Sequence, residues 1–364
     1  MENKDISAIK IRRLHIVNYK GIDEIELEFP MPRMADDPDV IVMGSRNGVG
    51  KTSVLECCAL LLIGLKKRSR SSNTFESVNQ QYSLDMPEMI IRSDAESARI
   101  DGDIIAGSLK TTWNMIVPRK GTVKTYGTIE ETKGDFLSMD TVEQLGQEDE
   151  MDSYKRFVSV IKGMNPNPLL SKFFLYFHSY RKVQEGNPEL GMMVVKKGFE
   201  ESIRVSIFKI ILMQALMSRG NLFEVQDTEL YEGAVNKLNE LMKRYAGGEI
   251  DKLRPSPDNT VDFRIQPING SPSYTFDGLS SGQKEIIATL FLIWFQTRNK
   301  PAVVLIDEPE LHLNARWHRV FVRQLIALAP DNQYIIATHS EDIFGSVDKD
   351  RRILIGVPSG VNHG

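Results

Sequence analysis

One local feature constrains the fold of this chain more than any other: an apolar strand that runs into a glycine-rich loop and then into a helix. We predict the strand over Val40–Met43 and the helix from Thr52 to about Gly64. The loop between them contains Gly48 and Gly50, which permit unusual dihedrals and a close approach of the backbone to a ligand. Because a loop at a helix N-terminus presents free N–H groups to an anion, the unit predicts a phosphate-binding loop.

Particular side chains of this loop fit a triphosphate and its metal ion. Lys51 can reach the outer phosphates, and the hydroxyl of Thr52 can bind Mg²⁺. The other candidate nucleotide-binding residues of the loop are Arg46, Asn47, Gly48, Val49, Gly50 and Ser53. Ser45 stands where the usual pattern has its first glycine, and Gly44 lies one place earlier. The alternative interpretation is a glycine-rich turn that caps an ordinary helix.

A second apolar strand ends in carboxylates. Val303–Ile306 is apolar throughout, as expected of a strand buried on both faces, and Asp307 and Glu308 follow it directly. Ligands of open α/β sheets bind at the carboxyl ends of strands. We therefore expect Asp307 to hold the magnesium ion through its water shell and Glu308 to orient or deprotonate the attacking water. The alternative is an ordinary strand followed by an acidic turn.

Two further segments add candidate nucleotide contacts. The segment Leu279–Gln283 precedes a predicted helix over 281–297, and a serine there suits the N-cap of an anion-binding helix start. Its candidate residues are Ser280, Ser281, Gly282 and Gln283. His339 follows a predicted strand over 333–338 and can contact a γ-phosphate or position water. Simple helix capping is the alternative for the first segment, unless it serves the nucleotide of another subunit.

The rest of the chain predicts an α/β protein. Two strands span 10–29, antiparallel strands span 98–130, and a buried strand ending in polar residues covers 169–181. A helical region covers 197–245 with a break near Gly220. The last third adds strands at 260–267, 302–306 and 352–356 and helices at 312–328 and 341–346. Strands that alternate with helices imply a mainly parallel, helix-covered sheet.

The order of these motifs resembles the ATP-binding-cassette ATPases. The opening Ile11–Ile22 and the segment Asp307–Leu313 look like the SMC/RecF branch of that family. The resemblance implies an ATPase that uses ATP and Mg²⁺, with Lys51, Glu308 and His339 as the catalytic residues. It also implies a head with a mixed or parallel sheet, an antiparallel β subdomain and a helical lobe. We place the lobes at 1–184, with an acidic excursion at 130–152, then at 185–250 and 251–364.

The resemblance also directs attention to one loop and to one position after the carboxylate strand. A glutamine loop is expected after the strand before the helical lobe, and Gln184 is the candidate there for binding the nucleotide and its magnesium. Arg181 competes for a phosphate or DNA role, and a solvated loop is the alternative for both. Asn314 stands where the family has an aspartate that acts across the dimer.

The spacing of the motifs leaves no room for the long coiled-coil arms of SMC proteins. The sequence ends soon after Leu354, so we also expect no C-terminal TOPRIM nuclease domain of the kind found in overcoming-lysogenization-defect proteins. The chain is therefore similar to compact ATPases of the Septu and PARIS anti-phage systems. That resemblance implies a head-to-tail homodimer with ATP between the Lys51 loop and the helix start at Ser280 and Gly282. It further implies a switch that controls a separate effector, such as a nuclease.

Net charge and apolar run length limit the classes of protein to which this chain can belong. The net charge of −4 lacks the basic excess of a dedicated nucleic-acid binder, although the basic run 66–70 leaves a nucleic-acid partner open. The longest apolar run, 286–295, is far shorter than the roughly 20 residues of a membrane span, so we expect a cytoplasmic protein with no membrane partner. A RecF-type DNA-repair clamp, a non-hydrolysing structural scaffold and the nucleotide-binding subunit of a transporter are the remaining alternatives.

Overall fold

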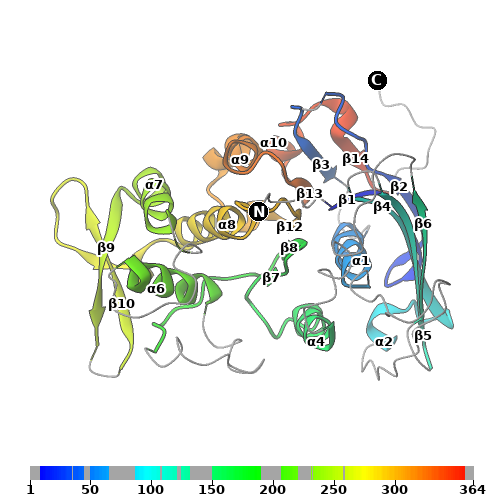
Figure 1. The fold of residues 1–364 in the computed structure, drawn as a ribbon, viewed down its shortest axis with the longest axis horizontal. Coiled ribbons are helices and arrows are strands. Elements are labelled where there is room, and N and C mark those ends of the chain that lie inside the picture. The colour runs from blue at the N-terminus through cyan, green and yellow to red at the C-terminus, as the bar shows by residue number, and fades with distance from the viewer. Residues whose placement is uncertain are drawn as a thin grey trace.

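The computed structural model describes residues 9–34, 36–44, 50–64, 87–106, 109–120, 124–131, 150–189, 206–219, 231, 233–256 and 259–356. Its centre is a six-stranded sheet in the order β14-β3-β13-β12-β8-β7 (Figure 1). In that order the strands are Arg352–Leu354, Asp39–Gly44, Gln333–Thr338, Val303–Asp307, Phe174–Phe177 and Leu169–Leu170. All neighbours pair in parallel except β7 and β8, which are antiparallel.

The central strands are apolar because each of their faces is covered. Along β12, Val303 and Leu305 belong to one hydrophobic core, while Val304 and Ile306 belong to the other. Side chains of β3, β13 and β8 alternate between the two cores in the same way. This alternation follows from the two-residue period of a strand, and it explains why the sequence shows continuous apolar runs there.

One core lies between the central sheet and a five-stranded antiparallel sheet in the order β2-β1-β4-β5-β6. In that order the strands are Ile22–Glu28, Ile9–Tyr19, Ser97–Ala106, Leu109–Pro118 and Lys124–Glu131. Helix α1 (Lys51–Gly64) lies between the two sheets and is buried along almost its whole length (Figure 1). The short helix α2 (Pro87–Ile90) and α4 (Glu150–Ile161) lie on the same side of the central sheet.

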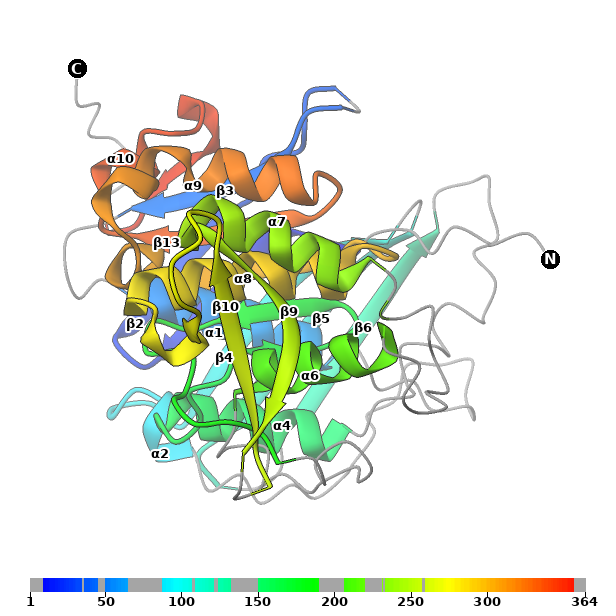
Figure 2. The ribbon, with the colours of Figure 1, turned by 90° about the vertical axis from the view of Figure 1, so that its left-hand side faces the viewer.

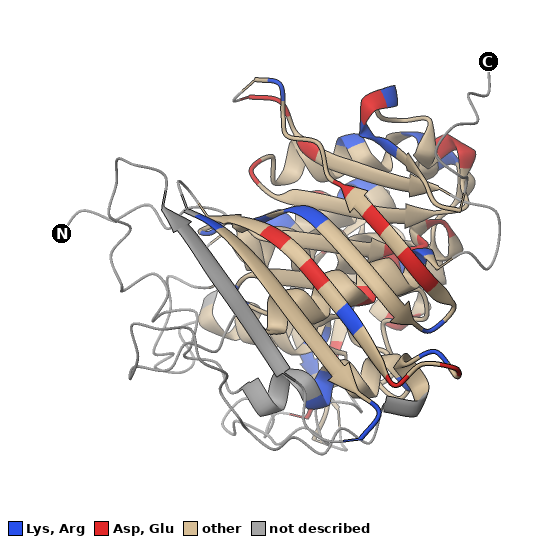
Figure 3. Cartoon of the chain, turned by 90° about the vertical axis from the view of Figure 1, so that its right-hand side faces the viewer, with Lys and Arg blue, Asp and Glu red and all other residues tan. Residues whose placement is uncertain are grey.

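Acidic and basic residues occupy neighbouring strands of the five-stranded sheet (Figure 3). Arg13 of β1 pairs with Glu26 of β2 and with Asp103 of β4. His15 lies 2.9 Å from Glu24 and 3.2 Å from Asp101. Among the described residues of this sheet, apolar side chains of β1 and β4 join the first core, while these charged groups pair with one another.

The second core covers the opposite face of the central sheet. It contains α8 (Ser281–Thr297) and α9 (Ala315–Leu328), with α10 (Glu341–Phe344) beside α9. Farther out lie α6 (Ile207–Arg219), α7 (Ala234–Ala246) and a three-stranded antiparallel sheet in the order β11-β10-β9 (Figure 2). Those strands are Tyr274–Thr275, Val261–Pro267 and Gly248–Pro255. Three single-turn 3₁₀ helices complete the described elements: η3 (Phe276–Gly278), η4 (Pro309–His312) and η5 (Lys349–Arg351).

The predicted α/β class, with a mixed central sheet, an antiparallel β part and a helical part, is confirmed. Several boundaries were wrong. Residues 169–181 form two short antiparallel strands and a loop, because Ser171–Phe173 turns the chain between them. The helix expected at 312–328 begins at Ala315, since Pro309 starts a separate 3₁₀ turn. Helix α4 and strands β9 and β11 were missed. Of the helix expected at 197–245, the structure describes α6 and α7, and most of the acidic excursion lies outside the described residues.

Candidate functional site

The first part of the site is the start of helix α1. Gly50 has φ +96°, and a Cβ there would lie 2.9 Å from Cγ1 of Ile22. The position therefore requires glycine for its backbone and for its space. Lys51 and Thr52 follow in the first turn of α1, with Ser53 buried behind them. The candidate residues Arg46, Asn47, Gly48 and Val49, together with Ser45, lie outside the described residues.

The glycine one place before the usual pattern, Gly44, has a packing role. It is the last residue of β3, and a Cβ there would lie 2.8 Å from the ring of Phe344 in α10. A side chain at this point would push the ring away from the sheet. The glycine therefore brings α10 close to the strand end that leads into the loop.

The end of β12 brings a carboxylate to the start of α1. Oδ2 of Asp307 accepts a hydrogen bond of 2.9 Å from the hydroxyl of Thr52. Asp307 is fully buried, and its Oδ1 has no hydrogen-bond partner among the described residues. Burial raises the pKa of this carboxyl, the Thr52 hydrogen bond opposes the shift and the charge of Glu308 adds to it, which together give a pKa of about 7.

This pair of oxygen donors fits a magnesium ion. Mg²⁺ takes only one or two protein ligands when phosphates and water supply the others. A buried carboxylate oxygen without a donor is also the group that gains most from a cation. Among the described residues, no cluster of three or more His, Cys, Asp or Glu side chains could hold a metal by itself. Thr52 and Asp307 are therefore the residues that would hold Mg²⁺ here.

Three side chains converge beside this pair. Nζ of Lys51 lies 2.8 Å from Nε2 of His339, and the same ring nitrogen lies 3.2 Å from Oε1 of Glu308. Burial lowers the pKa of Lys51, and the nearby carboxylates of Glu308, Asp307 and Glu310 oppose that shift. A cation, a carboxylate and an imidazole thus meet at the carboxyl edge of the sheet, with Glu308 and His339 both partly exposed.

Glu310 holds the histidine in place, and sequence reasoning assigned it no role. Its Oε2 accepts a hydrogen bond of 2.7 Å from the hydroxyl of Thr338, and its Oε1 accepts the main-chain N–H of His339. The two contacts tie the turn after β12 to the end of β13. The acidic run at 307–310 was the available signal, but it does not tell which carboxylate turns toward which strand.

The helix start at Ser280 forms a complete capping box. The hydroxyl of Ser280 accepts the N–H of Gln283, and Oε1 of Gln283 accepts the N–H of Ser280. The amide of Gln283 also donates to the carbonyl of Tyr245 in α7. Gly282 lies against the 3₁₀ turn after β12, since a Cβ there would be 3.0 Å from the carbonyl of His312. Ser280 and Ser281 are exposed.

The segment after β8 corrects one interpretation. Arg181 is buried and donates to main-chain carbonyls, which contradicts the solvated loop considered for it. One of these carbonyls is that of Asp307, at 2.9 Å. Gln184 lies half-buried three residues farther along, and its role beside magnesium stays a prediction. Nearby, burial lowers the pKa of His178 to about 3, so this ring is neutral at physiological pH.

Fold and site together define a class, an ATPase head of the SMC/RecF-like, ATP-binding-cassette type. The model of the AAA ATPase domain family matches residues 9–344, and the chain belongs to that family. Across the part of the chain that the structure describes, no helix combines the length and apolar character that a membrane span needs.

Named relatives agree with this family. The chain is 22% identical over 355 residues to the Septu protein PtuA of Bacillus mycoides, covering 95% of this chain and 40% of that protein. It is 21% identical over 393 residues to the Retron Vc95 probable ATPase of Vibrio cholerae, covering 96% of this chain and 74% of that protein. The chain thus spans two fifths of the length of the first relative.

A solved structure agrees in fold. An SMC head bound to the C-winged helix domain of ScpA aligns with a TM-score of 0.51 and 13% identity, covering 93% of this chain and 92% of that chain. At this identity the likeness concerns the fold alone.

Proposed function

We propose that this chain hydrolyses ATP, and that ATP joins two copies head to tail into a switch that controls a separate effector in anti-phage defence. One observation carries the proposal: Lys51, Thr52, Asp307, Glu308 and His339 come together at one edge of the central sheet. They come from the start of α1, the end of β12 and the end of β13. This is the arrangement that phosphoryl transfer to water requires.

In the proposed reaction, Lys51 and the N-terminus of α1 bind the outer phosphates of ATP. Glu308 accepts a proton from water as the water oxygen attacks the γ-phosphorus and the bond to the ADP oxygen breaks. The ammonium of Lys51 and the ring of His339 stabilise charge on the transferred group. Magnesium, held by Thr52 and Asp307, would neutralise the phosphate charge.

The exposed start of helix α8 supports the proposed dimer. Ser280 and Ser281 are exposed at the N-terminus of the 17-residue helix α8, where the helix dipole favours an anion. The Lys51 site and the Ser280 helix start are both candidate phosphate sites. A head-to-tail pair would join them through one γ-phosphate, and hydrolysis would remove that bridge.

The defence role and the effector rest on the relatives. One relative is named a Septu protein and another a retron probable ATPase, and the chain matches both along most of its own length. Septu is one of the anti-phage systems whose ATPases the sequence resembles. Recovery of a partner, such as a nuclease, with the tagged chain during phage infection would support effector control. Recovery of no partner under those conditions would count against it.

Glu308→Gln tests the switch. The variant retains a similar shape but cannot take the proton from water, so we expect it to bind ATP, hydrolyse it at least about 100-fold more slowly and accumulate as dimers. Light scattering with ATP and with ADP measures the association. Glu26→Gln, a surface position on the outer sheet, is the matched control and should behave as wild type. If Glu308→Gln shows no ATP-dependent association, the clamp is refuted.

ATP turnover with and without DNA, together with the proteins that co-purify, tests the remaining alternatives. Absence of hydrolysis would favour a non-hydrolysing scaffold. Strong stimulation by DNA would favour a RecF-type clamp, and constant co-purification with a membrane protein would favour a transporter subunit.

A further inference from the structure

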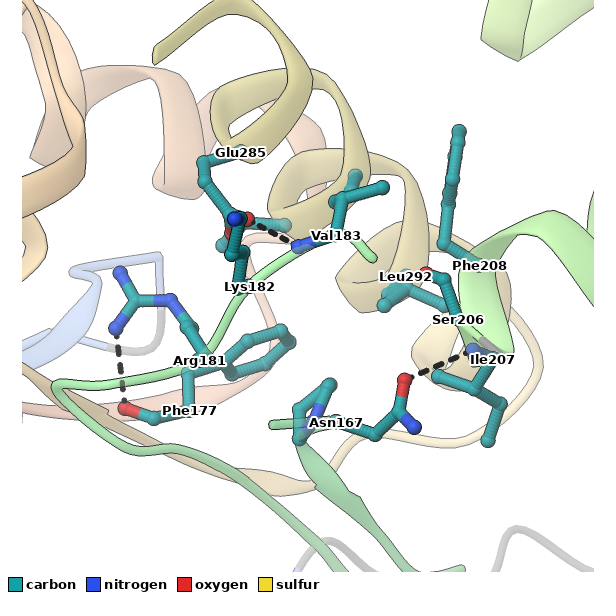
Figure 4. Close-up of a pocket in the computed structure, with 13 residues that line it drawn as sticks. Asn167, Phe177, Arg181, Lys182, Val183, Ser206, Ile207, Phe208, Glu285 and Leu292 are labelled. Carbon is teal, nitrogen blue, oxygen red and sulfur yellow. Dashed lines mark hydrogen bonds between the residues drawn. The ribbon is translucent and has the colours of Figure 1, made fainter. Parts of the chain in front are cut away.

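A buried arginine lies directly behind the candidate active site. The side chain of Arg181 is 3% exposed, and its Nη1 donates to the carbonyls of His178 at 2.8 Å and Asp307 at 2.9 Å. A third, longer contact of 3.5 Å reaches the carbonyl of Phe177 (Figure 4). Burying a guanidinium is costly unless hydrogen bonds and charges compensate it. Its position therefore needs an explanation beyond packing.

The contact with Asp307 continues a strand ladder. Strands β12 and β8 pair in parallel from Val303 and Phe174 to Ile306 and Phe177, where β8 ends. Asp307 extends one residue farther on β12, so β8 has no strand residue left to pair with it. The Arg181 guanidinium donates to the Asp307 carbonyl at this point. The side chain thus takes the place of a main-chain donor at the last peptide of the strand.

That peptide carries the next residue in an unusual conformation. Glu308 has φ 44° and ψ 59°, in the left-handed region that non-glycine residues seldom occupy. Its N–H bonds to the carbonyl of Ala337 on one side, and the preceding carbonyl bonds to Arg181 on the other. The two hydrogen bonds fix both ends of the Asp307–Glu308 peptide, and this fixes the direction of the Glu308 side chain.

The same segment is attached to the helix that begins at Ser280. Glu285 of α8 accepts the main-chain N–H of Val183, two residues beyond Arg181 (Figure 4). Burial lowers the pKa of Arg181, and the negative charge of Glu285 opposes that shift. Burial likewise raises the pKa of Glu285, and the positive charge of Arg181 opposes that shift in return. Beyond it, Asp277 accepts the N–H of Gly186 at 2.9 Å. The segment therefore spans from the end of β12 to the start of α8.

We propose that Arg181 is a positioning residue for ATP hydrolysis, which holds the Asp307–Glu308 peptide in its strained conformation and, through Glu285, fixes it relative to the Ser280 helix start. The inference rests on the proposed function of the site. Arg181 does not serve as a phosphate ligand in this arrangement, because the bonds of its guanidinium all go to main-chain carbonyls within the protein. It acts through Glu308.

Arg181→Met is the principal test, with Lys182→Met as the matched control. The control removes the adjacent, exposed cation and should leave turnover unchanged. We expect Arg181→Met to lower kcat about 10- to 100-fold, because a displaced catalytic group costs that much, while the Kd for MgATP changes less than about threefold. Arg181→Lys, which can still donate to a carbonyl, should restore part of kcat. A loss of ATP affinity with unchanged kcat would show a phosphate ligand and overturn the proposal.

Two further measurements separate positioning from general stability. In a Glu308→Gln background, Arg181→Met should cost little additional turnover, because both changes remove the same function. Full additivity of the two losses would overturn the proposal. Glu285→Gln keeps an oxygen acceptor for Val183 but removes the charge, and a smaller loss of kcat is expected from it. If Arg181→Met does not fold, Glu285→Gln serves as the test in its place. An unchanged kcat in Glu285→Gln would then refute the proposal that Arg181 acts through Glu285 of α8.

Amide hydrogen exchange of the nucleotide-free chain measures the effect of the Arg181–Asp307 contact without any need for ATP turnover. Arg181→Met should speed exchange in peptides that cover 308–313, and Lys182→Met should not. Unchanged exchange there contradicts the positioning role. If wild-type protein hydrolyses no ATP, the proposed function fails, whereas the exchange result still decides whether Arg181 holds this turn.

Discussion

Replacing Asp307 by asparagine should stabilise the nucleotide-free protein while it abolishes ATP turnover. The carboxylate is fully buried, and its Oδ1 has no hydrogen-bond partner among the described residues. When it is ionised, this side chain is a buried charge compensated mainly by the hydroxyl of Thr52. Asparagine keeps an oxygen for that hydroxyl and carries no charge. The same change removes the proposed magnesium ligand, so stability and activity should move in opposite directions.

The magnitude follows from the pKa of this group. Burial raises the pKa of Asp307 from 3.8 to about 7, a difference of about three units, or about 4 kcal/mol once the group is ionised in both states. Between these values the folded protein holds the proton and the unfolded chain does not. The contribution of Asp307 to the unfolding free energy therefore falls as pH rises from about 4 to about 7. Relative to low pH, where Asp307 is protonated in both states, the ionisation of Asp307 lowers the unfolding free energy by about 2 kcal/mol at pH 5 and by about 4 kcal/mol at pH 8.

Urea unfolding at pH 5 and pH 8 with EDTA measures this effect. The advantage of Asp307→Asn over wild type should be about 2 to 3 kcal/mol larger at pH 8 than at pH 5. Asp331→Asn, at an exposed aspartate, should show no such difference. Added Mg²⁺ should raise the stability of wild type and leave Asp307→Asn unchanged. A variant that is less stable than wild type at pH 8, or an advantage that does not depend on pH, would refute the reasoning.

Two further substitutions test the surroundings of the helix start. Ser280→Ala removes the capping hydroxyl and should lower the unfolding free energy by about 1 kcal/mol, measured by urea titration, with Ser280→Thr close to wild type. A drop in ATP-dependent association without any loss of stability would show that the hydroxyl serves only the phosphate. Lys209→Met removes a fully buried ammonium that lies 2.6 Å from Asp277, and we expect a loss of about 2 to 3 kcal/mol, because Asp277 keeps some solvent. If Lys209→Met were as stable as wild type, the Lys209–Asp277 ion pair would not contribute to stability.

Much of the central fold could be predicted because it follows from local patterns. The apolar run Val303–Ile306 indicated a strand buried on both faces, and its side chains do divide between two cores. Ser280 indicated a helix start, and a capping box is present there. Helix α4 escaped prediction because its buried apolar side chains, Phe157 and Val160 among those described, lie in its second half, after a first half rich in polar and charged residues. Its helical face becomes visible only when the core that receives it is known.

The arrangement behind the site could not be predicted from local patterns. The bond from Arg181 to the Asp307 carbonyl joins residues 126 positions apart, and that from Val183 to Glu285 joins residues 102 positions apart. An arginine in a polar segment gives no sign that its guanidinium will be buried, since the sequence resembles a surface loop. Burial here depends on where β8 ends relative to β12, and strand ends are set by the tertiary pairing.

The substitution of asparagine for the family's aspartate at position 314 now has a local explanation and a chemical consequence. Asn314 is the N-cap of α9, and its side-chain oxygen accepts the N–H of Arg316. Asparagine and aspartate cap helices about equally well, so the change leaves the helix start intact. Asn314 is also exposed, and the turn before it packs on Gly282 near the start of α8. In the proposed dimer, this turn would thus offer a partner subunit a neutral amide in place of a carboxylate. Any contact that Asn314 makes there would depend on hydrogen bonding, and the attraction of ATP would depend on the charges of Lys51 and magnesium.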